Sequence, residues 1–222
     1  MERVFKIGII DDDSSKKTQI MIRLMQGISE ASSEKQEKYL KYSLEPIEIK
    51  LKKELNDMLK QVVELNIDCV LVDYKLSSFE NVNYSGVDFA KALSQILYDF
   101  PIFILTSYED ALFSNEIFNS YQVFDFSRYL NETSERIELN YKIIEQILKT
   151  KKQKEQWEKE IKRLLPLAGK SEEIDSKLLD LDNKLERSIN GAFSIPDKVK
   201  KDLCANKLNE LLDKIDRLLE KG

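Results

Sequence analysis

The stretch Ile9-Ile10-Asp11-Asp12-Asp13 decides the fold, together with two further stretches of the same kind. These are Val70-Leu71-Val72-Asp73-Tyr74-Lys75-Leu76 and Ile102-Phe103-Ile104-Leu105-Thr106-Ser107. Each is a short apolar run that ends in polar groups able to handle a cation and a phosphoryl group. This pattern predicts buried parallel strands that deliver chemistry at their carboxyl ends.

The composition indicates a soluble globular protein. Of the 222 residues, 42% are hydrophobic and 34% are charged, which suits one full core plus an accessory segment. No run approaches the roughly 18 uninterrupted apolar residues of a membrane span, and the chain begins in a strand rather than in a signal peptide. We therefore expect a cytoplasmic protein without membrane insertion.

Charge, histidine and cysteine usage exclude several classes of function. The net charge of −5 is spread without a basic block, so nucleic-acid binding is disfavoured. A zinc hydrolase, a Ser-His-Asp enzyme and a histidine phosphocarrier each need an imidazole, and the chain has no histidine. Cys69 and Cys204 lie far apart and are most simply two unpaired thiols.

Short apolar runs alternate with amphipathic segments from residue 4 to about residue 149, which predicts βα units around a parallel sheet. Five strands are expected, over Val4–Ile10, Ile47–Leu51, Ile67–Asp73, Pro101–Thr106 and Tyr121–Phe126. Apolar residues three or four apart predict the helices Met21–Ile28, Leu55–Val62, Val87–Leu97, one around Ile117, and Ile137–Leu148. The polar stretch Ser29–Tyr42 either extends the first helix or forms a loop.

Beyond about residue 149 the composition changes to Lys, Glu, Leu and Asp. The segment Lys151–Gln156 is expected to continue the last helix in solvent, before Trp157 restarts an apolar face. Breaks at Pro166, Gly169 and Gly191 predict two or three helices. They are expected to form an antiparallel hairpin or a bundle.

Asp11, Asp12 and Asp73 are expected to converge. In a doubly wound sheet of order 2-1-3-4-5, the first and third strands are neighbours, and a crevice opens at their carboxyl ends. Crowded carboxylates repel one another, so the cluster makes physical sense if a hard divalent cation neutralises it. Mg²⁺ fits because it prefers oxygen ligands and bridges carboxylates and phosphates.

With Asp11, Asp12, Asp73 and Thr106 at three strand ends, the chain resembles the receiver domain of two-component response regulators. The resemblance covers about residues 4 to 149. It implies a flavodoxin-like (βα)5 fold with a doubly wound parallel sheet of order 2-1-3-4-5, in a receiver domain over residues 1–149. An all-α, coiled-coil-like domain for output or interaction is expected over residues 150–222.

The resemblance also implies roles for individual residues. Asp73 would be the phosphoacceptor, a carboxylate nucleophile that forms an aspartyl phosphate. Asp12 would bind Mg²⁺ directly and Asp11 mainly through water, and the main-chain carbonyl of Lys75 would complete the protein's share of the metal shell. Thr106 would hydrogen-bond a phosphoryl oxygen and report its presence. Its alternative role is helix capping.

One departure from the family concerns its lysine at the end of the fifth strand, which is followed by proline. No lysine occurs between Lys91 and Lys142. Arg128 is the nearest cation and is the expected substitute, although alignment through the aromatic residue puts Ser127 at that position. Arginine is not a neutral replacement for lysine. Lys75 is a further source of charge, from the other side of the site.

A second departure is the long loop Ser77–Gly86 after the phosphoacceptor. Gly86 still fits the turn that opens the next helix. The extra residues either cover the pocket, contact a partner, or form a tolerated surface insertion, which is the simplest interpretation. Phe124 and Phe126 are candidates for a rotating switch aromatic, and each is more simply a core residue.

The implied function is that of a response regulator in a two-component phosphorelay, with no enzymatic activity beyond its own aspartyl phosphorylation and dephosphorylation. Because the chain has no histidine, its partners would be a sensor histidine kinase or a histidine phosphotransfer protein, an unidentified downstream protein, and a second copy in a homodimer. One alternative is a non-phosphorylated pseudo-receiver that acts as a structural adaptor. Another is a haloacid-dehalogenase-like phosphatase with an Asp nucleophile. Of that family's pattern, only the Asp-x-Asp motif after the first strand is matched, by Asp11 and Asp13.

Overall fold

Five parallel strands form one sheet in the order β2-β1-β3-β4-β5. The computed structural model describes residues 3–76, 82–107, 122–191, 195 and 198–200. The strands are β1 (Arg3–Ile10), β2 (Tyr42–Glu48), β3 (Cys69–Val72), β4 (Ile102–Thr106) and β5 (Val123–Asp125). Neighbouring strands are parallel throughout. This order confirms the doubly wound, flavodoxin-like fold predicted from the sequence.

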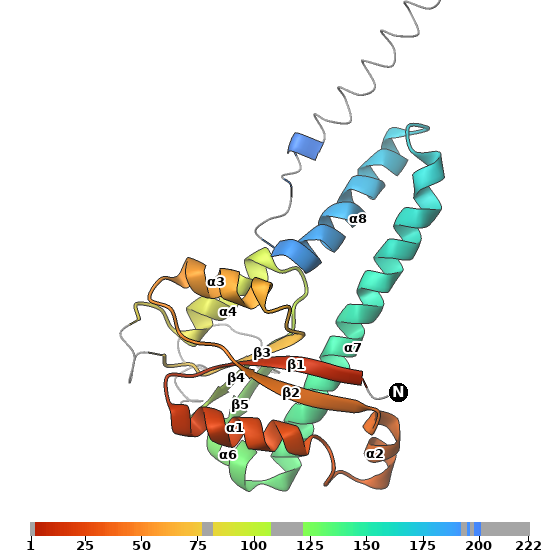
Figure 1. Cartoon of the computed structure of the whole chain (residues 1–222). Helices are drawn as coiled ribbons and strands as arrows, with labels where there is room; N and C mark the ends of the chain where they lie inside the picture. Colours follow the sequence, from red (N-terminus) through yellow and green to blue (C-terminus); the bar gives the residue numbers. More distant parts are fainter. Residues whose placement is uncertain (1–2, 77–81, 108–121, 192–194, 196–197, 201–222) are drawn as a thin grey trace, which may run out of the picture. The chain divides into compact units, whose positions relative to one another are not determined.

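Helices cover both faces of the sheet. In the described residues the helices are α1 (Ser14–Gln26), α2 (Ser33–Tyr39), α3 (Leu55–Glu64), α4 (Gly86–Ile96), α6 (Phe126–Asn131), α7 (Thr133–Leu164) and α8 (Glu172–Asn190), of which α8 belongs to the second unit described below. Figure 1 shows α3 and α4 on one face, and α1 and α6 on the other. The sheet is therefore the middle layer of three.

Each face of the sheet has its own hydrophobic core, because side chains alternate along a strand. In β3, Cys69 and Leu71 pack with residues of α1 and α7, whereas Val70 and Val72 pack with residues of α3 and α4. All four are buried, as expected for a central parallel strand. Arg3 and Lys6 lie in the exposed first half of β1, whereas the buried runs of β1, β3 and β4 end in polar residues at their carboxyl ends, which lie at one edge of the sheet.

The second strand differs from its predicted position over Ile47–Leu51. β2 spans Tyr42–Glu48 and pairs with β1 in parallel register. Pro46 is tolerated inside it because β2 is an edge strand. The alternating residues Ile47, Ile49 and Leu51 thus predict which side chains face the core better than they predict the bounds of the strand. Ile49 lies just beyond β2, yet it is buried and its amide donates to the Ile9 carbonyl at 3.0 Å.

Two short helices were not predicted as such. The polar crossover forms a separate helix, α2, rather than an extension of the first helix or a loop. The fifth strand ends at Asp125, and Phe126, which was assigned to that strand, begins α6. The helix expected around Ile117 lies outside the described residues. The continuous helix expected from Ile137 through Gln156 is confirmed as part of α7.

Two compact units divide the chain, residues 1–153 and 154–222. In the second unit, the end of α7 and α8 form the expected helical hairpin, joined by a 3-10 turn at Leu165–Leu167. Trp157, Leu164 and Leu181 are its buried cluster. None of the helices in the described ranges is long and apolar enough to cross a membrane. Cys69 is buried and free, and Cys204 lies outside the described residues.

Candidate functional site

Three carboxylates meet at the carboxyl edge of the sheet. Asp11, Asp12 and Asp73 each offer an oxygen that lies within 4.8 Å of the others. Asp11 follows β1 and Asp73 follows β3, and the Asp73 amide donates to the Ile10 carbonyl at 2.9 Å, which extends the pairing of the two strands. Asp11 is 1% exposed and Asp73 is 4% exposed. The structure therefore brings these predicted metal ligands together.

Burial makes the charges of this cluster costly. It raises the pKa of Asp11 to about 7, with further contributions from the charges of Asp73 and Asp12. The Asp13 amide opposes this rise by donating to Asp11 Oδ1 at 2.8 Å. Burial likewise raises the pKa of Asp73, against the effects of Lys16, Thr106 and the Tyr74 amide. Buried carboxylates with raised pKa values mark a place where a bound cation would be stabilising.

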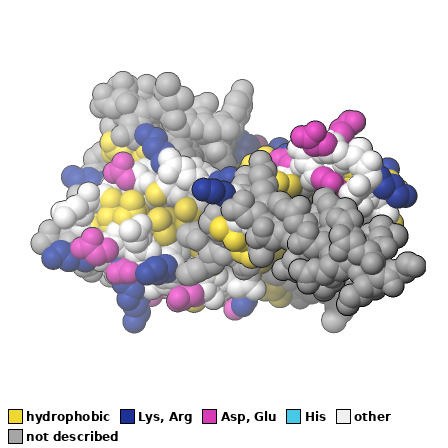
Figure 2. All heavy atoms as spheres, turned by 90° about the horizontal axis from the view of Figure 1, so that it is seen from above, with side chains coloured by type: hydrophobic (Ala, Val, Ile, Leu, Met, Phe, Trp, Pro, Cys, Tyr) yellow, Lys and Arg dark blue, Asp and Glu magenta, His cyan; other side chains and the backbone are white. Residues whose placement is uncertain are grey.

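The cluster is a local feature, and the surface charges are mixed in sign. Figure 2 shows Lys and Arg side chains interspersed with Asp and Glu over the face that it displays. The net charge of the whole chain is only −5. The raised pKa values of Asp11 and Asp73 thus follow from their burial at the strand ends rather than from a broadly acidic surface.

Thr106 is the last residue of β4 and is fully buried. Its side chain hydrogen-bonds Asp73, one strand away in the sheet. The Tyr74 amide donates to Asp73 Oδ1 at 2.8 Å and so holds the orientation of the same carboxylate. The structure therefore places the predicted hydroxyl residue beside the predicted phosphoacceptor.

Lys16 also belongs to this site, and the sequence analysis missed it. Its Nζ lies 3.5 Å from Asp73 Oδ2. Asp13 is the N-cap of α1 and accepts the amides of Ser15 at 2.8 Å and Lys16 at 3.3 Å, which fixes Lys16 in the first turn. Side chains on a helix lean toward its N-terminus, so the ammonium returns to the edge of the sheet. The available signal was a lysine four residues beyond Asp12.

The electrostatic setting keeps Lys16 charged. Burial, the largest effect, lowers its pKa, but the charges of Asp73, Asp11 and Asp13 and the hydrogen bond to Asp73 together raise the pKa above the ordinary value. Its side chain is 24% exposed. A protonated ammonium is therefore present beside the carboxylate of Asp73.

The other cations predicted for the site have different surroundings. The guanidinium of Arg128 pairs with Glu132 at 3.3 Å and with Glu135, and its side chain is 51% exposed. These ion pairs do not support the role expected for Arg128, which stays a prediction. Ser127 is exposed on α6. Lys75 has an exposed side chain two residues beyond Asp73, and its carbonyl stays a predicted metal ligand.

Gly86 joins the site to α4. A Cβ atom there would lie 1.9 Å from the carbonyl oxygen of Asp73, so only glycine allows this approach. The Gly86 amide donates to the Tyr74 carbonyl at 2.8 Å. Ser85 and Asp88 form a capping box at the start of α4. The helix thus packs directly against the backbone of Asp73. Residues 77–81 of the long loop lie outside the described residues.

Three residues of the alternative hypotheses have structural roles. Phe124 and Phe126 are both buried in the core between the sheet, α1 and α7, as the simpler expectation for them has it. Phe124 lies in strand β5 as expected, whereas Phe126 reaches the core from α6. Asp13, which the phosphatase alternative pairs with Asp11, accepts two amides of α1 as its N-cap. Its carboxylate therefore has a capping function that needs no substrate.

Comparisons with known proteins do not assign the chain to a family. No protein-family model matches it, and no curated protein does. Four solved chains match, one being the crystal structure of the anti-anti-sigma factor PhyR from Bartonella quintana, at 15% identity and a TM-score of 0.41. The match covers 70% of this chain and 52% of that chain, so the chain spans about half the length of that protein. The assignment of a flavodoxin-like fold rests on the strand order of the chain itself.

Proposed function

We propose that this chain is a receiver-type phosphoacceptor, which takes a phosphoryl group on Asp73 with Mg²⁺ and thereby controls contacts made by its C-terminal helices. The observation that carries the proposal is the meeting of Asp11, Asp12 and Asp73 within 4.8 Å. The hydrogen bond from Thr106 to Asp73 supports it. A carboxylate cluster with only a structural role would need neither the buried hydroxyl of Thr106 nor the close approach of Gly86 to the backbone of Asp73.

The donor set fits Mg²⁺. Asp11, Asp12 and Asp73, with the carbonyl of Lys75, would supply oxygen ligands, which this ion prefers. When bound, it would neutralise charge on the carboxylates and on the transferring phosphoryl group. The raised pKa values of Asp11 and Asp73 support the fit, because they mark negative charge that the protein alone compensates incompletely.

The chemical step uses the carboxylate of Asp73 as nucleophile. One of its oxygens attacks phosphorus, and the bond from phosphorus to the nitrogen of a phosphohistidine breaks. The imidazole leaves with the electron pair and can then take up a proton. The Tyr74 amide orients Asp73 through Oδ1. Thr106, which hydrogen-bonds Asp73, would donate to a phosphoryl oxygen. Because the chain has no histidine, the phosphohistidine must come from a sensor kinase or a phosphotransfer protein.

A pseudo-receiver that acts as a structural adaptor is the second candidate. It is favoured by the ion pairs of Arg128, which engage the cation expected to replace the strand-5 lysine. In that case the same fold would bind its partner without a phosphoryl group. The two candidates differ in whether Asp73 can be modified.

Intact-protein mass spectrometry after incubation with Mg²⁺ and acetyl phosphate tests the proposal. Wild type should gain the mass of one phosphoryl group, and Asp73→Asn should not. Asp68→Asn is a matched control, because Asp68 precedes the other end of β3 and pairs there with Lys151 at 2.8 Å. It should be modified like wild type. A wild type that gains no mass and binds no beryllofluoride would establish the adaptor.

A further inference from the structure

Lys16, in the first turn of α1, brings an ammonium group to the carboxylate of Asp73. We propose that Lys16 is the residue that binds the phosphoryl group on Asp73, and that α1 supplies the ammonium which β5 lacks. This inference rests on the proposed function and assigns one more residue to the same site. It starts from the 3.5 Å separation between Lys16 Nζ and Asp73 Oδ2.

The position of the ammonium fits this role. Lys16 Nζ lies 5.3 Å from the centroid of the Phe126 ring, and Phe126 is the first residue beyond β5. The ammonium is therefore close to the side chains of the residues that directly follow β3 and β5. A phosphoryl group on Asp73 would project from the same carboxylate that Lys16 already contacts.

The ammonium also has hydrogen-bonding capacity for a phosphoryl group. It carries three donors, and its separation of 3.5 Å from Asp73 exceeds the 2.7–2.9 Å typical of a strong charge-assisted hydrogen bond. Conversion of the carboxylate into an acyl phosphate places additional negative oxygens within reach of Nζ. The attraction should therefore increase on phosphorylation rather than be replaced.

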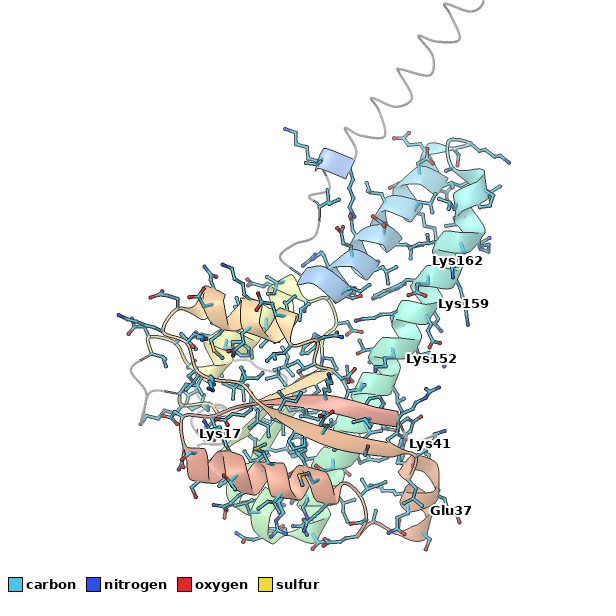
Figure 3. All side chains as sticks on the ribbon, in the orientation of Figure 1. Lys17, Glu37, Lys41, Lys152, Lys159 and Lys162 are labelled. Carbon is cyan, nitrogen blue, oxygen red and sulfur yellow. The ribbon has the colours of Figure 1, made fainter. Side chains whose placement is uncertain are left out.

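Neighbouring cations are already paired with other carboxylates. Arg128 pairs with Glu132 and Glu135. Lys17, labelled on α1 in Figure 3, pairs with Glu48 at 2.8 Å, at the end of β2. Lys17 shares the helix, the charge and the partial burial of Lys16. It is therefore the matched control for a loss of charge at this end of α1.

Two binding measurements on the full chain test the inference, both by isothermal titration calorimetry on wild type, Lys16→Met, Lys17→Met and Asp73→Asn. The first measures Mg²⁺ alone, and the second measures beryllofluoride at saturating Mg²⁺. Lys16→Met should bind beryllofluoride about 10- to 100-fold more weakly, the loss that corresponds to one charge-assisted hydrogen bond. It should bind Mg²⁺ at least as tightly as wild type, because a cation next to a ligand carboxylate has been removed.

The opposite directions of the two effects separate binding from damage to the fold. Lys17→Met should match wild type in both measurements, and Asp73→Asn should lose beryllofluoride. Undiminished beryllofluoride binding by Lys16→Met would overturn the assignment of Lys16 alone. Weaker binding of both ligands would assign Lys16 a structural role and overturn it as well. If wild type binds Mg²⁺ but no beryllofluoride, the proposed function fails, and the phosphoryl role of Lys16 fails with it.

Discussion

Replacing Asp11 by asparagine removes a charge from the most buried position of the acidic cluster. Asp11 is 1% exposed, next to Asp12 and Asp73. Asparagine has nearly the same volume, and its side-chain oxygen can still accept the Asp13 amide that donates to Asp11 Oδ1 at 2.8 Å. The substitution therefore tests the cost of the charge rather than the loss of a contact. We expect Asp11→Asn to stabilise the metal-free protein at pH 8.

The pKa of Asp11 sets the size of the effect. Burial and neighbouring charges raise it from 3.8 to about 7. Each tenfold change in proton affinity corresponds to about 1.4 kcal/mol, so charging this carboxyl in the folded state costs at most about 4 kcal/mol. Water that enters the cluster reduces that cost. We expect about 2 kcal/mol of added stability in the variant at pH 8.

The pH dependence follows from the direction of the shift. Because the pKa of Asp11 is higher in the folded state, the folded protein binds more protons than the unfolded chain between about pH 4 and pH 7. The stability linked to this group is fully present below pH 3.8 and is lost as the pH rises through about 7. The advantage of Asp11→Asn should therefore grow from pH 5 to pH 8.

Urea unfolding followed by circular dichroism measures the difference, with EDTA present, at one-unit steps from pH 5 to pH 8. When Mg²⁺ at 100 times its dissociation constant replaces EDTA, it should stabilise wild type by about 2.7 kcal/mol. It should stabilise Asp11→Asn less, because one ligand carboxylate is gone. Equal stability of the two proteins at pH 8, or a difference that does not change with pH, would refute the account of Asp11 as a buried charge.

Three further substitutions test the packing. In Gly86→Ala the new Cβ would lie 1.9 Å from the Asp73 carbonyl oxygen, so the backbone of Asp73 must shift. The variant should lose about 3 kcal/mol of unfolding free energy in urea and bind Mg²⁺ more weakly in calorimetry. Unchanged Mg²⁺ affinity would contradict this. Asn140→Leu should cost about 2 kcal/mol of unfolding free energy, since the buried amide donates to the Gly27 carbonyl at 2.7 Å, at the end of α1. Leu181→Ala should cost the helical hairpin about 3 kcal/mol. The single tryptophan, Trp157, packs in the same cluster, so a red shift of its emission at lower urea reports the loss.

The central strands can be predicted from the sequence because they are buried on both faces. The buried runs at residues 7–10, 69–72 and 102–105 admit no charged side chain, so Asp11, Asp73 and Thr106 mark the carboxyl ends of β1, β3 and β4. Once the strand order is given, these ends meet at one edge. The acidic part of the site therefore follows from hydrophobic patterning.

The two edge strands, β2 and β5, are harder to predict, because buried positions and strand pairing no longer coincide there. In the first part of β2, Leu44 is buried between the polar residues Ser43 and Glu45, and Pro46 follows where the next apolar strand residue would be expected. The sequence of this part of the strand therefore resembles that of the polar crossover before it. Ile49 is buried although it lies beyond the strand. At β5, Phe126 continues an alternating pattern, but Asp125 caps a helix instead, accepting the Arg128 amide at 2.7 Å.

Lys16 was missed for a different reason, which concerns charge rather than pattern. Alignment with a family asks which residue occupies a position along the chain, whereas an anionic site needs a cation at a position in space. The first turn of α1 follows β1 after three residues and its side chains lean back toward the sheet. A lysine in that turn can therefore reach Asp73 on the neighbouring strand as readily as a lysine on β5 could. The absence of lysine from β5 changes the element that supplies the charge, and the 3.5 Å contact identifies that element as α1.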